Sequence, residues 1–122
     1  MYSTASDLAA VSQMMLNGGT FNGKRILSPL SVDAMTSNHT LNLESVMTGR
    51  PAYQGLGWGI YGDMFSAFPL TTPGSFGHNG AFGSIVWIDP ERDLIRIFLQ
   101  HRFGPGNESN LFMAMAGAAV VN

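Results

Sequence analysis

Residues 84–99 read SIVWIDPERDLIRIFL, two apolar runs that are separated by a short polar turn. The first run extends from Ser84 to Ile88 and the second from Leu94 to Leu99. Both runs are rich in β-branched and aromatic residues, which favour strands. Because residues 89–93 are polar and turn-forming, the two runs are predicted to form an antiparallel pair joined by a solvated connection.

Upstream of this pair, the sequence begins with a predicted amphipathic helix. Ser3 or Thr4 can cap its start, and Asp7 is placed as an acidic residue of a capping box. The helix is expected to end at residues 17–19, Asn-Gly-Gly, because glycine suits a left-handed C-terminal cap. The apolar residues expected to share one face of this helix are Leu8, Val11 and Met15.

Further elements are predicted before and after the strand pair. Asn22-Gly23 indicates a small hairpin, and Ser28-Pro29 indicates the start of a short helix ending near Ser37. Residues 56–61 have the composition of a strand, whereas 38–54 and 62–75 are expected to be irregular. Residues 111–121 are apolar on almost every side, which predicts a helix buried between a sheet and something else. Together these elements predict an α+β fold, an antiparallel β-sheet with N- and C-terminal helices.

Composition limits the partners of the chain. Its 122 residues favour a single core, and 6 basic against 8 acidic residues give a net charge of −2. Such a balance supplies no basic field, so we expect no nucleic-acid partner. Only 11% of the residues are charged, against about 25% in a typical soluble protein. We therefore expect some faces to be covered by other protein.

No targeting or membrane signal is expected within the chain. Residues 1–10 lack a basic start and an apolar run, which argues against a signal peptide. The least charged stretches are broken by proline and glycine or are shorter than the roughly 20 residues of a spanning helix. Cysteine is absent, which removes disulfides and thiolate chemistry but assigns no compartment. Localisation therefore stays open.

Residues 77–83, GHNGAFG, form the strongest candidate site, because glycines hold a titratable side chain just before a predicted strand. The imidazole of His78 can polarise a substrate or bind an anion, and neighbouring N–H groups can point at a developing oxyanion. The alternative is a plain hairpin turn at Asn79-Gly80 with His78 exposed at the strand end.

Other candidate residues carry weaker signals. Arg102 can hold a substrate carboxylate, although a solvated strand end explains it as well. Ser75 precedes His78 by three residues, but no third orienting group is evident for a catalytic pair. The three histidines lack the close spacing of metal ligands, so neither a metal nor a cofactor is expected. An aromatic and methionine-rich stretch either lines an apolar acyl pocket or packs in the core: Trp58, Tyr61, Met64, Phe65 and Phe68.

Six blocks in order resemble the C-terminal part of the serine β-lactamase superfamily, in the branch of class C β-lactamases, D-amino-acid peptidases and esterases. They cover nearly the whole chain, and together they are far more specific than any one of them. The blocks are YSTASDL at 2–8, MLNGG at 15–19, GKRILSP at 23–29, GLGWG at 55–59, GHNG at 77–80 and WIDP at 87–90.

The resemblance implies a penicillin-binding-protein-like fold and a serine hydrolase that forms an acyl-enzyme with an ester, amide or β-lactam. Three sequence boxes line such a site, and His78-Asn79-Gly80 matches the third. By resemblance, His78 contacts substrate or tunes protons, Gly80 gives clearance, and the Ala81 N–H supplies half of an oxyanion hole. The family is often periplasmic or secreted, and some members are cytoplasmic.

The first two boxes of the family are absent from the chain. Lys24 is the single lysine and Phe21 stands three residues before it, so no Ser-x-x-Lys is present. Tyr2 belongs to a block that follows the catalytic tyrosine of the family, so that role is not transferred to it. The run from Ala81 to Gly83 is also shorter than the glycine-rich stretch of many relatives.

Residues 1–122 are therefore interpreted as a single partial domain, the C-terminal part of a hydrolase or a remnant of one. Such a chain is expected to be inactive alone and to expose an uncovered strand edge, which a second copy or the missing N-terminal part would cover. The alternative from another class is a non-catalytic binding or interaction module that retains the family scaffold. In the complete enzyme the partner would be a small acyl substrate.

Overall fold

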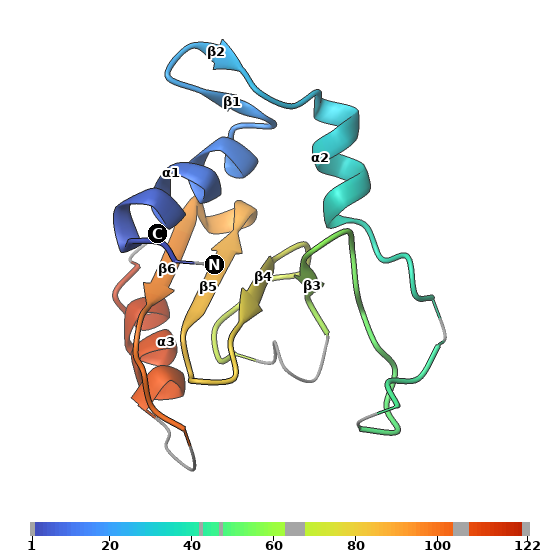
Figure 1. Ribbon diagram of the computed structural model, residues 1–122, viewed down its shortest axis with the longest axis vertical. Coiled ribbons are helices and arrows are strands. Elements are labelled where there is room, and N and C mark those ends of the chain that lie inside the picture. The colour runs from blue at the N-terminus through green and yellow to red at the C-terminus, as the bar shows by residue number, and fades with distance from the viewer. Residues whose placement is uncertain (1, 42, 47, 63–67, 104–107, 121–122) are drawn as a thin grey trace.

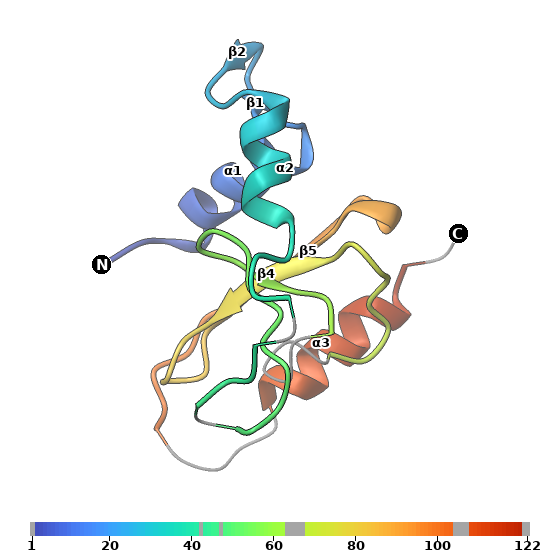
Figure 2. The same ribbon diagram turned by 90° about the vertical axis from the view of Figure 1, so that its right-hand side faces the viewer.

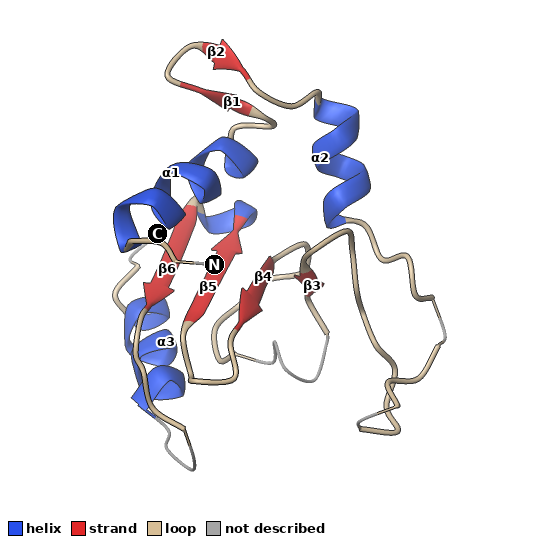
Figure 3. Ribbon diagram, in the orientation of Figure 1, coloured by secondary structure: helices blue, strands red, loops and turns tan. Residues whose placement is uncertain are grey.

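The structure is a computed structural model that describes residues 2–41, 43–46, 48–62, 68–103 and 108–120. It confirms an α+β architecture of helices and antiparallel strands (Figure 1; Figure 3). In chain order the elements are α1 (Ala5–Leu16), β1 (Thr20–Phe21), β2 (Lys24–Arg25), α2 (Pro29–Thr36), β3 (Gly59–Ile60), β4 (Phe76–Asn79), β5 (Ile85–Asp89), a 3-10 turn (Pro90–Arg92), β6 (Leu94–Phe98) and α3 (Glu108–Ala118).

The main sheet has four strands in the order β3-β4-β5-β6, and each neighbouring pair is antiparallel. Strands β5 and β6 form the predicted hairpin, with Ile85 opposite Phe98 and Asp89 opposite Leu94. Asp93 adopts a φ of 50° at the end of the 3-10 turn, which reverses the chain into β6. The strongest sequence prediction is therefore confirmed.

Strand β4 was not predicted, and β3 is shorter than the strand expected over residues 56–61. The sequence pattern did not indicate β4 because glycine, which is rare in strand interiors, occupies its second position. A Cβ built on Gly77 would lie 2.2 Å from the Val86 carbonyl oxygen and 2.3 Å from Trp87 Cε3. Gly77 thus permits a close approach between β4 and β5 that a larger residue would prevent.

Helix α1 begins as predicted. Thr4 is the N-cap, and its Oγ1 accepts a hydrogen bond from the Asp7 N–H at 3.2 Å while donating to the Asp7 carboxylate at 2.8 Å. The predicted buried face was wrong at Val11, which is 47% exposed, because Ser12 takes its place beside Met15 in the core. The buried stripe therefore lies one position further along the helix.

The predicted small hairpin and second helix are also present. Strands β1 and β2 pair around Asn22 and Gly23, whose φ angles of 48° and 75° fit a tight two-residue turn. Ser28 caps α2 by accepting from the Ser31 N–H at 3.0 Å. The described part of the segment between α2 and β3 contains only isolated bridges, as expected of an irregular stretch.

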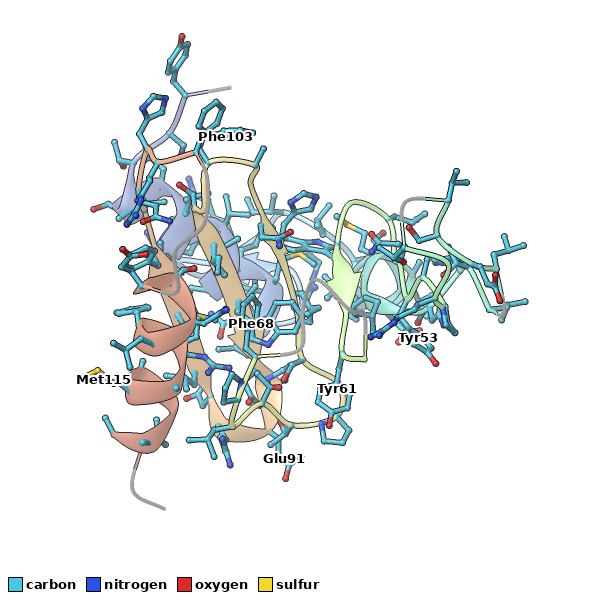
Figure 4. The ribbon with its side chains drawn as sticks, turned by 90° about the horizontal axis from the view of Figure 1, so that it is seen from below. Tyr53, Tyr61, Phe68, Glu91, Phe103 and Met115 are labelled. Atoms are coloured by element: carbon cyan, nitrogen blue, oxygen red, sulfur yellow. The ribbon has the colours of Figure 1, made fainter. Side chains whose placement is uncertain are left out.

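Helices cover both faces of the sheet, and α1 and α3 lie on opposite sides of it (Figure 2). On the α1 side, Met15 packs with Phe76 and Ile88, and α2 contributes side chains to the same cluster. On the α3 side, Met113 packs with Trp87. The other side of α3 is uncovered, and Met115 points away from the sheet with 63% of its surface exposed (Figure 4). The second neighbour predicted for this helix is not among the described residues.

In the part of the chain that the structure describes, no helix is long and apolar enough to cross a membrane.

Candidate functional site

His78 lies on β4, opposite Val86 of β5, and its side chain is exposed. Its Nδ1 is 2.7 Å from the Asn79 carbonyl oxygen, which can only accept a hydrogen bond. In the neutral imidazole Nδ1 therefore carries the proton, and Nε2 keeps its lone pair. Within the described residues no hydrogen bond engages Nε2, so this nitrogen is available to an incoming group.

The chain turns at residues 80–84 around Ala81 and Phe82, two positions later than the plain-turn alternative places it. Asn79 still pairs with Ile85 as the last residue of β4. Gly80 then donates its N–H to the Ser84 carbonyl at 2.8 Å, and Gly83 donates to the Gly80 carbonyl at 2.9 Å. His78 is thus exposed near a strand end, as that alternative expected, but Asn79 belongs to the strand.

Ala81 lies at the outer part of this turn and is exposed. Among the described residues, no hydrogen bond uses its N–H. A backbone donor that is fixed in direction and has no internal partner can stabilise a developing oxyanion without reorganising. The Ala81 N–H and His78 Nε2 are thus two groups of this turn and its strand that have no hydrogen-bond partner among the described residues.

The chain that follows β6 holds this turn in place. Ser84 Oγ donates to the Gln100 carbonyl at 2.9 Å and accepts from the Gln100 N–H at 3.2 Å. The Arg102 N–H donates to the Phe82 carbonyl at 3.2 Å. Gly83 has a φ of +85°, and a Cβ there would lie 1.9 Å from Gln100 Nε2. These contacts extend the β5–β6 pairing past its last strand residues and brace the turn that carries Ala81.

Aromatic side chains gather where the two segments meet. Phe82 stacks on His101 with ring centroids 4.8 Å apart, and Phe103 lies 5.8 Å from Phe82. Phe103 projects from this end of the sheet and is 80% exposed (Figure 4). The turn is therefore flanked by an exposed aromatic surface, which the sequence did not indicate because its members are separated along the chain.

Arg102 lies in the segment that follows β6, and its guanidinium forms an ion pair with Glu108 at the start of α3. A hydrogen bond from its own backbone N–H is the largest cause of a lowered Glu108 pKa; desolvation opposes it, and the charge and hydrogen bond of Arg102 lower the pKa further. Both side chains are about half exposed, so solvent screens the pair.

The remaining candidates take structural positions. Ser75 is buried, and its Oγ donates to the Thr72 carbonyl at 2.7 Å, so its hydroxyl is used within its own turn. Trp58 packs edge-to-face on Phe76 and Phe68 packs the same way on Trp87, which favours core packing over a pocket. Tyr61 is exposed, and Met64 and Phe65 lie outside the described residues.

The histidines do not converge. His39 Nε2 is 2.6 Å from the Ala34 carbonyl near the end of α2, whereas His101 stacks on Phe82. No group of three or more potential metal-ligating side chains occurs among the described residues.

Comparison with known proteins defines the class. The family model named Beta-lactamase matches residues 1–120. The chain therefore belongs to the Beta-lactamase family.

Individual relatives agree with this assignment. The chain is similar to Protein Rv1367c of Mycobacterium tuberculosis, with 34% identity over 111 residues, covering 83% of the chain and 28% of the relative. It is also similar to a putative D-alanyl-D-alanine carboxypeptidase of Escherichia coli O157:H7, with 29% identity over 105 residues, covering 84% of the chain and 22% of the relative. The chain thus spans only about a quarter of these curated relatives.

Among solved structures, the fold is similar to a β-lactamase (Mb2281c) from Mycobacterium bovis. The TM-score is 0.74 and the identity 26%, and the match covers 95% of this chain and 43% of the other.

Proposed function

We propose that the chain is the C-terminal part of a serine hydrolase that cleaves an ester, an amide or a β-lactam through an acyl-enzyme. This part carries the third sequence box of the family, His78-Asn79-Gly80. The observation that carries the proposal is the turn after β4. His78 is exposed, and its Nε2 has no hydrogen-bond partner among the described residues. The Ala81 N–H also has no acceptor among those residues. An acyl-transfer site needs a proton-handling group and oxyanion donors of this kind.

Each residue of the turn has a role in this proposal. His78 contacts the substrate or assists proton movement through Nε2. A Cβ on Gly80 would meet only the Ser84 carbonyl oxygen, at 3.8 Å, so this position leaves open space beside the turn, where we place the substrate acyl group. The Ala81 N–H supplies one oxyanion donor, and removing one such donor typically costs about 3–4 kcal/mol of transition-state stabilisation. Asn79 fixes the end of β4, and Arg102 is the proposed contact for a substrate carboxylate.

The nucleophile of this site would lie outside the 122 residues. The chain has no Ser-x-x-Lys, and its buried Ser75 hydroxyl is bonded to Thr72. We therefore expect no turnover from this chain by itself. The family relatives it matches are several times longer, which leaves room for the serine, lysine and tyrosine boxes elsewhere in a complete enzyme.

The proposal extends to the uncovered surfaces. Within the described residues, β6 pairs only with β5, so its outer edge is unpaired. We infer that this edge and the outer side of α3 are covered either by the rest of a longer protein or by a second copy of the chain. A small acyl compound would be the substrate of the complete site.

A chimera tests the proposed function. Residues 1–120 would replace the matching segment of the M. bovis β-lactamase, and hydrolysis of a chromogenic lactam and of a nitrophenyl ester would be measured. We expect a folded chimera to hydrolyse at least one of them. The change His78→Ala should lower kcat/KM by about 100-fold, in the range of a lost acid–base group.

The matched control is His39→Ala, which removes a histidine whose ring bonds to the α2 backbone. It should leave kcat/KM within a few-fold of the parent chimera. A chimera that is folded by circular dichroism but hydrolyses neither substrate would contradict the proposal, as would equal losses for the two histidine variants.

A further inference from the structure

A buried arginine lies between the sheet and α3, away from the turn that carries His78. Arg96 is on β6 and only 1% of its surface is exposed. Its Nη1 donates to the Met113 carbonyl at 2.8 Å and lies 3.4 Å from the Pro69 carbonyl. Gly117 of α3 makes room for the guanidinium, because a Cβ there would lie 3.2 Å from Nη1. Nε and Nη2 of Arg96 have no partner among the described residues.

A second donor without a partner belongs to the residue across from Arg96 on the same face of the sheet. Trp87 lies directly opposite Arg96 in the β5–β6 pairing, is fully buried, and its Nε1 has no partner among the described residues. Its Cε3 edge lies over Gly77 of β4, since a Cβ on Gly77 would come within 2.3 Å of that atom. Nε1 is on the opposite side of the indole from Cε3, so it lies on the side of the ring away from β4, where β6 is the neighbouring strand.

Asp89 is the carboxylate whose charge acts on Arg96, but it makes no direct contact with the guanidinium among the described residues. An arginine side chain keeps its positive charge throughout the pH range in which proteins fold. Burial lowers the pKa of Arg96, the charge of Asp89 raises it and that of Arg92 lowers it. The Asp89 oxygens accept from the N–H and Oγ1 of Thr72, and no ion pair joins Asp89 to Arg96 in the described structure. The direct acceptors of the Arg96 guanidinium are thus two carbonyl oxygens rather than a carboxylate.

We propose that Arg96 Nε, Arg96 Nη2 and Trp87 Nε1 bind a small monovalent anion, such as chloride, enclosed between β5, β6 and α3. Three buried donors lack acceptors, and the carboxylate that acts on the guanidinium charge spends its described hydrogen bonds on Thr72. A water molecule would accept from two of the donors but would bring no negative charge to the guanidinium. Because the site is closed by α3, the anion binds the folded chain and is released on unfolding, so it acts as a structural ion.

Thermal and urea unfolding in sodium chloride and sodium gluconate at equal ionic strength tests the site. Above the dissociation constant, each tenfold rise in chloride should lower the unfolding equilibrium constant by about tenfold, beyond any effect of gluconate. Arg96→Met should abolish this difference, whereas Arg50→Met, which removes one exposed positive charge, should retain it. Equal unfolding of the native chain in the two salts would overturn the proposal and favour water.

Fluorescence tests the site without changing Arg96, in case Arg96→Met does not fold. In a Trp58→Phe background the emission reports Trp87, which is buried and therefore shielded from ions in bulk solution. Bromide bound beside the indole N–H should quench this emission along a saturable curve, and added chloride should reverse the quenching. Quenching that is absent, or that rises linearly with bromide and is unaffected by chloride, would overturn the proposal.

Discussion

Two glycines separated by only two residues have opposite steric surroundings. Gly77 faces the backbone of β5, with a built Cβ 2.2 Å from the Val86 carbonyl oxygen, whereas Gly80 has a single neighbour at 3.8 Å. Gly77 is thus a packing requirement of the sheet, and Gly80 is a free position at the candidate site. The sequence predicted both as glycines that allow close approach, but it could not separate their roles, because the clash depends on the β4–β5 register.

Gly77→Ala should therefore destabilise the chain far more than Gly80→Ala. The extra methyl group at position 77 meets backbone and the Trp87 ring, which cannot yield without opening the β4–β5 pair. We expect a loss of about 3 kcal/mol or more for Gly77→Ala and less than about 0.5 kcal/mol for Gly80→Ala. Urea unfolding of the two variants and the native chain measures both values. Similar losses for the two would refute the register of β4.

At the scale of single elements, local signals identified those elements whose stabilising contacts are close in sequence. The cap at Thr4, the turn at Asn22-Gly23 and the β5–β6 hairpin all follow from short patterns. The brace between Ser84 and Gln100 did not, since it joins segments 16 residues apart through one hydroxyl. The candidate site was found from the GHNG block, but its support was visible only in three dimensions.

The start of α3 should respond to acid through Glu108. Because the pKa of this carboxyl is lowered in the folded chain, its contribution to stability is present above the unfolded pKa. It is lost as pH falls through the folded pKa. Carboxyl-carbon NMR should show Glu108 titrating below the ordinary glutamate value of about 4.3, with the first turn of α3 loosening in the same interval.

Arg102→Gln should raise the pKa of Glu108 without restoring the ordinary value, because the hydrogen bond from its own N–H remains the main cause. Arg50→Gln serves as the control and should not change the titration. A Glu108 curve that is the same in all three proteins would show that Arg102 does not pair with it in solution.

At the scale of the whole molecule, large apolar side chains are exposed at the β6 end of the sheet and on the outer side of α3, among them Leu99, Leu111 and Met115. The outer edge of β6 is unpaired in the described structure, and Leu99 beside it is 45% exposed. The low charge in the sequence predicted that some faces are covered, but composition could not say which. The sheet order places β6 at an edge, and the chain matches only part of longer relatives. We therefore expect the covered face to include the outer edge of β6.

The isolated chain should accordingly associate as its concentration rises. Light scattering coupled to gel filtration should give a mass that increases with loading. Leu99→Lys should reduce the association because lysine beside an edge strand opposes pairing with another strand. Leu30→Lys, at an exposed position on α2, should change it little. A monodisperse monomer at high concentration would argue against an uncovered interface.

We propose that this chain presents the third box of a serine hydrolase but contains no activated serine. Intact-mass analysis of the folded chain after incubation with a reactive fluorophosphonate, with peptide mapping of any adduct, tests this proposal most directly. We expect no adduct, which would leave His78 as a site residue whose nucleophile lies on other sequence. A single stoichiometric adduct on a serine of these 122 residues would contradict it.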